Sequence, residues 1–214
     1  MSIKKSAIVF FLFITSTVFS QVELGLNIGI GAANVRIQNP SSVSDLFESN
    51  SNPMAVSFGP SITLGVTDKW SIKGGLNMSF NPSALEFNGD SSYAISTSFT
   101  SQEQRYQNLY IELPVVARYH LRKRDKAFSP YTFFGAVYDY QLLETCPVGI
   151  ECLNHTKDYN LGTILGVGFE LSKLDVAAKT QFGLLNTITE DYQISADELK
   201  MHKDLFMIEI GYKF

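Results

Sequence analysis

Apolar side chains alternate with polar or small side chains along most of this 214-residue chain. The clearest stretch, residues 109–121, reads LYIELPVVARYHL. Every odd position in it is apolar, whereas the even positions include Glu112, Arg118 and His120. Successive side chains of a β-strand point to opposite faces of the sheet, so this period of two predicts a strand with one continuous apolar face. Pro114 has no N–H to donate to a neighbouring strand, so we expect a bulge or local break there.

Eight stretches of the sequence share this period. We predict strands at residues 22–32, 57–66, 70–80, 109–121, 131–143, 159–171, 175–185 and 205–214. For residues 131–143 both faces contain aromatic residues, and Asp139 and Gln141 favour the odd-numbered face as the polar one. Strands of soluble proteins are usually about five or six residues long, whereas a tilted strand that crosses a membrane needs about 9–11. The lengths of these stretches favour membrane crossing.

The connections between the predicted strands alternate between long and short. Residues 33–56, 81–108, 144–158 and 186–204 form long polar connections, whereas residues 67–69, 122–130 and 172–174 form shorter ones. Bacterial outer-membrane barrels have an even number of antiparallel strands, short periplasmic turns and longer external loops. The sequence therefore predicts an all-β fold, an eight-stranded antiparallel up-and-down transmembrane β-barrel, with both ends of the mature chain in the periplasm.

The two faces of each strand indicate which side meets lipid. In a bilayer every backbone polar group must be paired, so a sheet spans the membrane only when it is closed. A soluble barrel such as a lipocalin would turn its apolar face inward and carry a densely charged exterior. Here the polar face is small and glycine-rich, so we expect it to line a narrow lumen and the apolar face to contact outer-membrane lipid.

The N-terminal residues have the pattern of a secretory signal. Lys4 and Lys5 precede the apolar run AIVFFLFITSTVF. Val18 and Ser20 are small enough to precede a cleavage site after Ser20. A predominantly apolar run of thirteen residues is too short for a membrane-spanning helix, which needs roughly 20. We therefore predict that residues 1–20 form a cleaved signal peptide, that residues 21–214 form the barrel, and that the protein lies in the outer membrane of a Gram-negative cell envelope.

Charged residues recur on the predicted lumen face. They are Glu23, Lys73, Glu112, Arg118, Glu170, Lys179, Glu209 and Lys213. We expect ion pairs between Glu23 and Lys213 and between Lys179 and Glu209, with Lys73 and Glu112 as diagonal candidates. One interpretation is a selective channel or a proton path. The other, which we favour, is a plug, because an eight-stranded barrel is just wide enough for its side chains to fill.

Aromatic residues lie near the ends of the predicted strands. Trp70, Tyr119 and Tyr131 are the main examples. Outer-membrane barrels carry girdles of aromatic side chains at both membrane interfaces. We therefore predict that these three residues lie at an interface.

Cys146 and Cys152 lie close together in the predicted connection 144–158. Exported proteins meet oxidising conditions, so we predict a disulfide within that loop. A zinc site would need two further ligands and only His155 is near, so we expect no metal or other cofactor.

Other functional classes find little support in the sequence. The net charge is −4, which does not suit a nucleic-acid partner. His155 and His202, with Ser195 and Asp197, fall in predicted external loops, but no G-x-S-x-G nucleophile motif is present, and we predict that the protein is not an enzyme. The stretch SADELKMHKDLF has helix-like signals, and we favour a solvated loop for it over a partner-binding helix.

The chain resembles the PorT-like outer-membrane β-barrel proteins of Bacteroidota in LYIELPVVARYHL, SPYTFFGAVYDY and the terminal IEIGYKF. The resemblance covers the mature chain and implies a barrel of mostly uncharacterised role, with one branch tied to a protein-secretion and gliding machinery. Ile210, Tyr212 and Phe214 also resemble the signal that the barrel-insertion machinery reads. We expect a structural, adhesion or partner-binding role through the external loops; the alternative is a narrow transport pore or an accessory subunit of a secretion complex.

Overall fold

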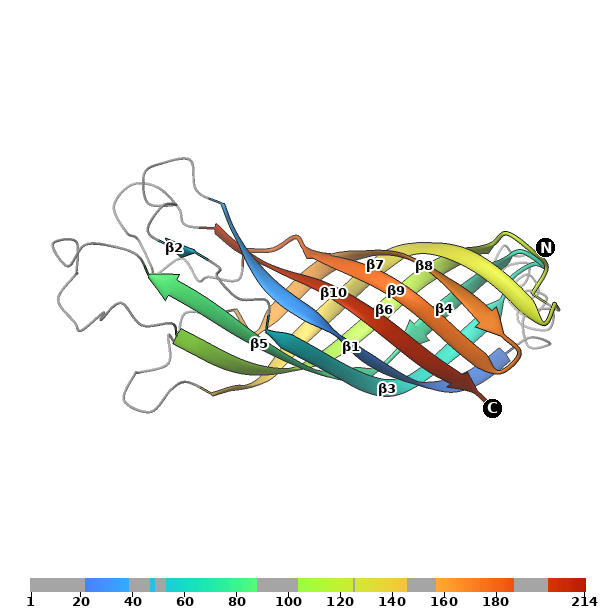
Figure 1. The fold of residues 1–214 in the computed structure, drawn as a ribbon, viewed down its shortest axis with the longest axis horizontal. Coiled ribbons are helices and arrows are strands. Elements are labelled where there is room, and N and C mark those ends of the chain that lie inside the picture. The colour runs from blue at the N-terminus through green and yellow to red at the C-terminus, as the bar shows by residue number, and fades with distance from the viewer. Residues whose placement is uncertain are drawn as a thin grey trace, which may run out of the picture.

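The computed structural model describes residues 22–38, 47–48, 53–87, 104–124, 126–145, 157–186 and 200–214. The strands are β1 (Val22–Gln38), β2 (Phe47–Glu48), β3 (Met54–Gly65), β4 (Trp70–Gly75), β5 (Asn77–Phe87), β6 (Gln104–His120), β7 (Phe128–Thr145), β8 (Tyr159–Leu171), β9 (Leu174–Gly183) and β10 (Lys200–Lys213). They form one elongated sheet of tilted strands that curls around a central axis (Figure 1). The predicted signal peptide and the predicted Cys146–Cys152 disulfide lie outside the described residues.

The sheet closes on itself through β1. One edge of β1 pairs with β10, where Leu26 lies opposite Tyr212, and the other edge pairs with β3, where Leu26 lies opposite Pro60. All the strand pairs are antiparallel. β4 and β5 together form one strand of the wall, and the two-residue β2 pairs only with the far end of β5. The fold is thus a closed eight-stranded antiparallel barrel, which confirms the prediction.

The interruption between β4 and β5 lies opposite a proline of β6. Pairing with β6 runs to Gly74, opposite Val115, and resumes at Asn77, opposite Glu112, without a change of register. Pro114 lies within this gap and has no N–H to donate to a neighbouring strand. We predicted a bulge or local break at Pro114, and the structure places the break in the neighbouring strand while β6 itself continues.

Several strands are longer than the sequence predicted. β1 and β6 have 17 residues, β7 has 18 and β10 has 14. Most of the additional residues lie at the end with the long connections (Figure 1), whereas residues 128–130 of β7 lie at the end with the short connections. We favoured a solvated loop for SADELKMHKDLF over a helix, and from Lys200 onward both are wrong, because β10 already begins there. Pairing with the extended β1 keeps this part of the chain in a strand.

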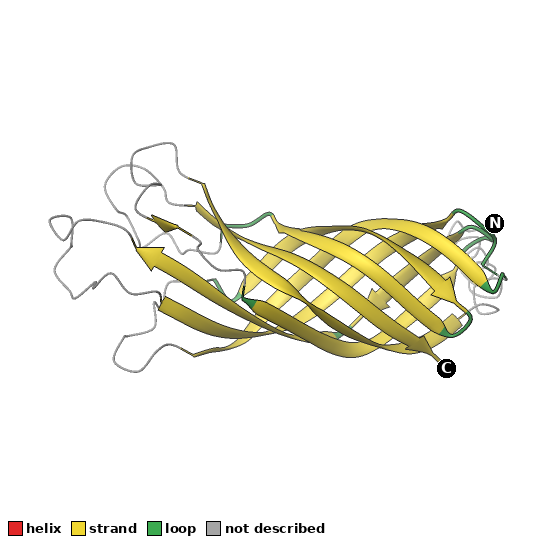
Figure 2. Cartoon of the chain, viewed as in Figure 1, coloured by secondary structure: helices red, strands yellow, loops and turns green. Residues whose placement is uncertain are grey.

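The short connections gather at the opposite end, where green loops join the strands (Figure 2). In the first, the backbone N–H groups of Lys69 and Trp70 donate to the Thr67 hydroxyl over 3.2 and 3.0 Å. Residues 172–173 form a two-residue turn between β8 and β9, in which Ser172 has a φ of 56°. This left-handed conformation is one that glycine adopts at lower cost than serine.

The two faces of the wall differ sharply in exposure. Outward-facing Ile28, Val115 and Leu165 are 58, 57 and 51% exposed, whereas inward-facing Glu112 and Arg118 are 1 and 2% exposed. A soluble protein would bury the first group and expose the second. The apolar face therefore points away from the lumen, as predicted. No described helix is long and apolar enough to cross a membrane.

Candidate functional site

The lumen contains a continuous series of alternating charges. We call it the ion-pair chain, and its members in order of contact are Arg124, Glu23, Lys213, Glu170, Arg118, Asp175, Lys73, Glu209 and Lys179. Successive members lie 2.7–3.3 Å apart between nitrogen and oxygen. The series begins at Arg124, at the end of the barrel with the short connections, and runs from there into the lumen. Apart from Arg124, its members lie on the inward faces of strands.

Asp175, on β9, is the central junction of the ion-pair chain. Its Oδ2 accepts hydrogen bonds from Arg118 Nη2 at 2.7 Å and from Lys73 Nζ at 3.1 Å. Its Oδ1 accepts a hydrogen bond from the Tyr131 hydroxyl. The Arg118 guanidinium also lies 4.5 Å from the centre of the Tyr131 ring. Asp175 is only 4% exposed, so these donors replace the water that a carboxylate would otherwise bind.

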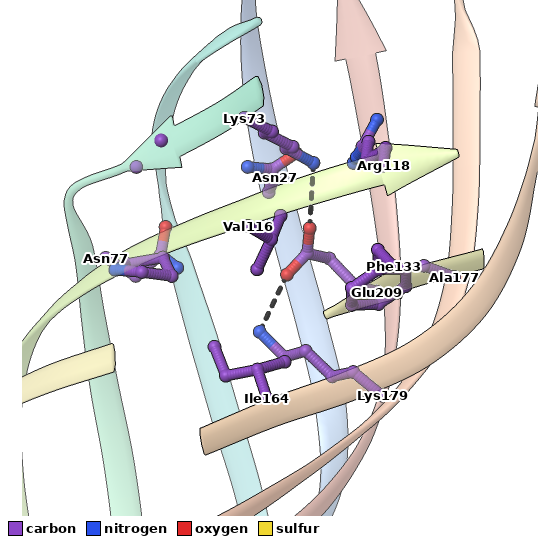
Figure 3. Close-up of a pocket in the computed structure, with 13 residues that line it drawn as sticks. Asn27, Lys73, Asn77, Val116, Arg118, Phe133, Ile164, Ala177, Lys179 and Glu209 are labelled. Carbon is purple, nitrogen blue, oxygen red and sulfur yellow. Dashed lines mark hydrogen bonds and ion pairs between the residues drawn. The ribbon is translucent and has the colours of Figure 1, made fainter. Parts of the chain in front are cut away.

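Glu209, on β10, joins the inner members of the ion-pair chain. Its two oxygens accept hydrogen bonds from Lys73 at 3.0 Å and from Lys179 at 2.8 Å, as the dashed lines in Figure 3 show. Lys73 also donates to Asn27 Oδ1 at 2.9 Å. Each charged group here has a charged partner, which is the condition for keeping ions away from bulk water.

A smaller cluster lies farther toward the end with the long connections. We call it the outer triad, and it consists of Glu112, Asp139 and Lys203. Lys203 Nζ lies 3.2 Å from Asp139 Oδ2 and 3.5 Å from Glu112 Oε1, and it sits over the ring of Tyr110 at 3.8 Å from the centroid. Gln181 donates to Asp139 Oδ2 at 2.9 Å.

The charges of the two clusters balance. The ion-pair chain has five cations and four anions, whereas the outer triad has one cation and two anions. Together they hold six of each sign. Ion-selective pores concentrate one sign of charge along the path. A neutral and mutually paired set is instead suited to filling the lumen.

Little free space remains among these side chains. The cavity lined by Lys73, Arg118 and Glu209 offers about 30 Å³ to the centres of water-sized spheres (Figure 3). A second cavity beside Glu23 and Lys213 offers about 10 Å³. A single water requires about 10–15 Å³ by this measure. The two cavities therefore have room for a few water molecules and for no larger ligand.

The structure brings together two of the three predicted ion pairs. Glu23 lies 2.8 Å from Lys213, and Lys179 lies 2.8 Å from Glu209. The predicted diagonal pair between Lys73 and Glu112 is wrong. Lys73 lies opposite Val116 of β6, four residues from Glu112, which is about 13 Å along a strand. Lys73 contacts Asp175 and Glu209 instead, and Glu112 contacts Lys203.

Sequence reasoning missed Arg124, Asp175, Asp139 and Lys203 as members of the lumen site. Arg124 lies in the predicted connection 122–130 and not in a predicted strand. Asp175 and Asp139 occupy the polar face of predicted strands, so the alternation itself was a sufficient signal. Lys203 lies two residues before the predicted start of the last strand, and the observed β10 begins earlier, at Lys200. No signal in the sequence indicated the position of Lys203 along the barrel axis.

The predicted interfacial aromatics divide between the two faces. Trp70 is 41% exposed and its ring lies 5.0 Å from that of Tyr119 on the outer face. Tyr131 is not interfacial: it is 2% exposed and donates to Asp175 inside the lumen. The odd-numbered face of β7 points inward, and this places Tyr131 with Phe133 and Asp139. At the chain end, Ile210, Tyr212 and Phe214 all face outward.

The histidines do not form a reactive centre in the described residues. His120 is fully buried, and its two ring nitrogens lie 3.2 Å from Ser71 Oγ and 3.1 Å from Ser129 Oγ. His202 is buried in β10, whereas Ser195, Asp197 and His155 lie outside the described residues. Within the described part of the chain, no group of three or more His, Cys, Asp or Glu could hold a metal ion.

Comparisons with known proteins agree with this architecture. Residues 16–189 match the family described as "Outer membrane protein beta-barrel domain". The crystal structure of Neisserial surface protein A (NspA) is similar, with a TM-score of 0.50, 10% identity, and coverage of 91% of this chain and 99% of that one. OprG from Pseudomonas aeruginosa gives a TM-score of 0.48, 16% identity, and coverage of 89 and 95%. The outer membrane enzyme PagL gives 0.45, 9%, and 88 and 98%.

No curated protein matches the chain. At such low identity the likeness to NspA concerns the fold alone. The family match covers most of the sequence, and the closed barrel with its outward apolar face is the architecture that the family description names. The chain therefore belongs to the outer-membrane protein β-barrel domain family.

Proposed function

We propose that the protein is a non-conducting, non-enzymatic barrel that anchors its long external connections in the outer membrane, where they bind a partner or a surface. The observation that carries this proposal lies in the described part of the lumen, where paired charges surround two cavities that have room for only a few waters. A protein that moved solutes through the barrel would need a continuous path. With the lumen occupied, the connections at the external end are the part available for interaction.

Conductance of single proteins in planar bilayers tests this proposal. We expect the wild-type protein to give no open-channel current. A variant that shortens three lumen side chains, Lys73→Ala, Arg118→Ala and Glu209→Ala, is the matched positive case, because it empties the space around the larger cavity. Open-channel currents from the folded wild-type protein would contradict the proposal and support the transport pore.

A second candidate is an accessory role in a protein-secretion or gliding complex. The resemblance of LYIELPVVARYHL, SPYTFFGAVYDY and IEIGYKF to PorT-like proteins favours it. The test is a pull-down from envelope solubilised in mild detergent, with the intact protein compared with a variant whose residues 88–103 and 187–199 are replaced by short Gly/Ser linkers. We expect the intact protein to retain specific envelope proteins that the linker variant loses. Equal recovery by both would exclude these connections as the binding surface.

A further inference from the structure

The end of the barrel with the short connections carries an unusual concentration of positive charge. We call this surface the turn rim, and it comprises residues 66–69, 121–127 and 172–173. The turn rim contains six Lys or Arg and two Asp in its sequence. By contrast, the connecting segments at the other end, 39–53, 88–103, 146–158 and 184–199, contain ten Asp or Glu and one Lys. Among the segments that join the strands, basic residues are therefore concentrated in the short connections and acidic residues in the long ones.

Most cations of the turn rim form no ion pair with a carboxylate of the described residues. Arg124 pairs with Glu23 of the ion-pair chain, and Lys123 pairs with Asp68 at 3.0 Å. The remaining four cations are exposed, and none of them makes an ion pair with a carboxylate among the described residues. They are Lys69, Arg122, Lys126 and Lys173. Exposed cations of this kind are available to an external anion.

The backbone holds the turns of this rim against one another. The Lys69 carbonyl accepts from the His120 N–H at 2.8 Å, and the Ala127 carbonyl accepts from the Ser172 N–H at 3.1 Å. The Lys173 carbonyl accepts from the Lys213 N–H at 2.8 Å. The backbone of the turn rim is thus held in place by the fold, so that binding of an anion has to order only the side chains of the cations.

The cations lie where the lipid-facing belt ends. Lys69 precedes Trp70, Arg122 follows Leu121, which is 62% exposed, and Lys173 lies 5.8 Å from the Tyr212 ring on the outer face. Trp and Tyr of membrane proteins sit at the level of the lipid headgroups. The phosphates of the surrounding leaflet are therefore the anions that these side chains can reach without leaving the barrel.

We propose that the turn rim binds the phosphate headgroups of anionic phospholipids and concentrates these lipids around this end of the barrel. Clusters of Lys and Arg beside a membrane-spanning segment attract anionic lipids by this electrostatic mechanism. The inference is independent of the proposed loop function. It depends on the charge and position of the rim and not on a closed lumen.

Trp70 provides a probe at the required place, because it is the single tryptophan of the chain and lies beside Lys69 on the outer face. The protein is reconstituted in two bilayers: a minority of brominated phosphatidylglycerol in phosphatidylcholine, and the same fraction of brominated phosphatidylcholine in phosphatidylglycerol. Bromine quenches tryptophan only at contact. We expect quenching by the minority lipid to correspond to about two- to fivefold enrichment of phosphatidylglycerol at Trp70, and to weaken in about 1 M salt.

The variant carries Lys69→Gln, Arg122→Gln, Lys126→Gln and Lys173→Gln, and its expected enrichment falls to unity. The control carries Lys157→Gln, which removes a cation from the other end and should leave the enrichment unchanged. Heat-dependent gel mobility checks that each variant is folded. Equal quenching by the two lipids in the wild-type protein overturns the proposal, as does enrichment that survives both the fourfold substitution and high salt. If the fourfold variant does not fold, the wild-type salt dependence alone decides.

Discussion

Two neighbouring valines show how differently the barrel treats its two faces. Val115 is 57% exposed on the outer face of β6, whereas Val116, the next residue, is 7% exposed in the lumen. The outer face is a nearly uninterrupted apolar belt, and the inner face combines a few apolar residues with paired charges. The interior is thus held together by ion pairs and hydrogen bonds, while the apolar side chains are left to lipid.

The difference between the two faces explains why the charged side chains of the lumen matter for stability. In a soluble protein the apolar residues of the wall would form the core and contribute most of the folding free energy. Here lipid solvates them, so removing one outward methyl group leaves no cavity. A lumen carboxylate is different, because its loss leaves buried cations without their partner.

The largest effect is expected at the junction of the ion-pair chain. Asp175→Asn keeps the shape of the side chain but removes the charge that faces Arg118 and Lys73. We expect a loss of about 3–5 kcal/mol in the free energy of unfolding, because breaking a buried ion pair leaves an uncompensated charge. Urea unfolding in lipid vesicles measures it.

The matched control for this prediction is Asp68→Asn. Asp68 pairs with Lys123 at 3.0 Å, but its side chain is 67% exposed. Such exposed pairs contribute about 0.2–1 kcal/mol. Equal losses for the two variants would show that the lumen is solvated like the surface and would remove the distinction between them.

A smaller loss is expected when a charge is placed on the lipid face. Leu165 lies at the centre of β8 and points outward. Leu165→Arg should reduce the free energy of unfolding by about 2–4 kcal/mol, because a guanidinium at the bilayer midplane loses its hydration. Leu171→Arg, at the end of the same strand, should cost about 0–1 kcal/mol. Equal losses in the free energy of unfolding for the two variants would show that Leu165 does not lie nearer the bilayer midplane than Leu171.

The smallest effect is expected outside both faces, in the β8–β9 turn. Ser172 has a φ of 56°, which costs a residue with a Cβ more than it costs glycine. Ser172→Gly should raise the free energy of unfolding by about 0.5 kcal/mol, because relief of this strain exceeds the extra entropy that glycine loses on folding. Ser172→Ala should give no such gain, and a gain for alanine as large as for glycine would show that the turn is not strained.

The alternation of side chains was enough to predict the barrel, its eight strands and the direction of each face. It also placed most charges of the ion-pair chain in the lumen, because a charge between two apolar neighbours marks the polar face of the strand. Periodicity shows which face of a strand a residue occupies, but it does not show the position of that residue along the barrel axis. Lys73 and Glu112 share the lumen face but lie too far apart along the wall to pair.

Tyr131 shares the odd-numbered face of β7 with Asp139, so the alternation that makes this face polar also places Tyr131 in the lumen. The interfacial prediction used only its position near a strand end.

The lengths of the strands depended on information that a single strand does not contain. The extension of β1 and β10 to residues 38 and 200 follows from their pairing with each other. Residues 33–38 carry their apolar residues at odd positions, the reverse of residues 22–30, and residues 200–204 contain only one apolar residue. Neither segment therefore continues the apolar pattern of its strand.

Methyl NMR in lipid nanodiscs can measure, without any substitution, whether lipid or water contacts each face of the barrel. A paramagnetic lipid with its label in the acyl chain should broaden the methyl signals of Val115 and Leu165 much more strongly than those of Val116 and Ile164, which lie farther from the lipid. A water-soluble paramagnetic agent should broaden none of the four. Broadening of Val115 and Leu165 by the water-soluble agent, or equal broadening of all four by the lipid, would contradict a barrel with an apolar outer face and a filled polar lumen.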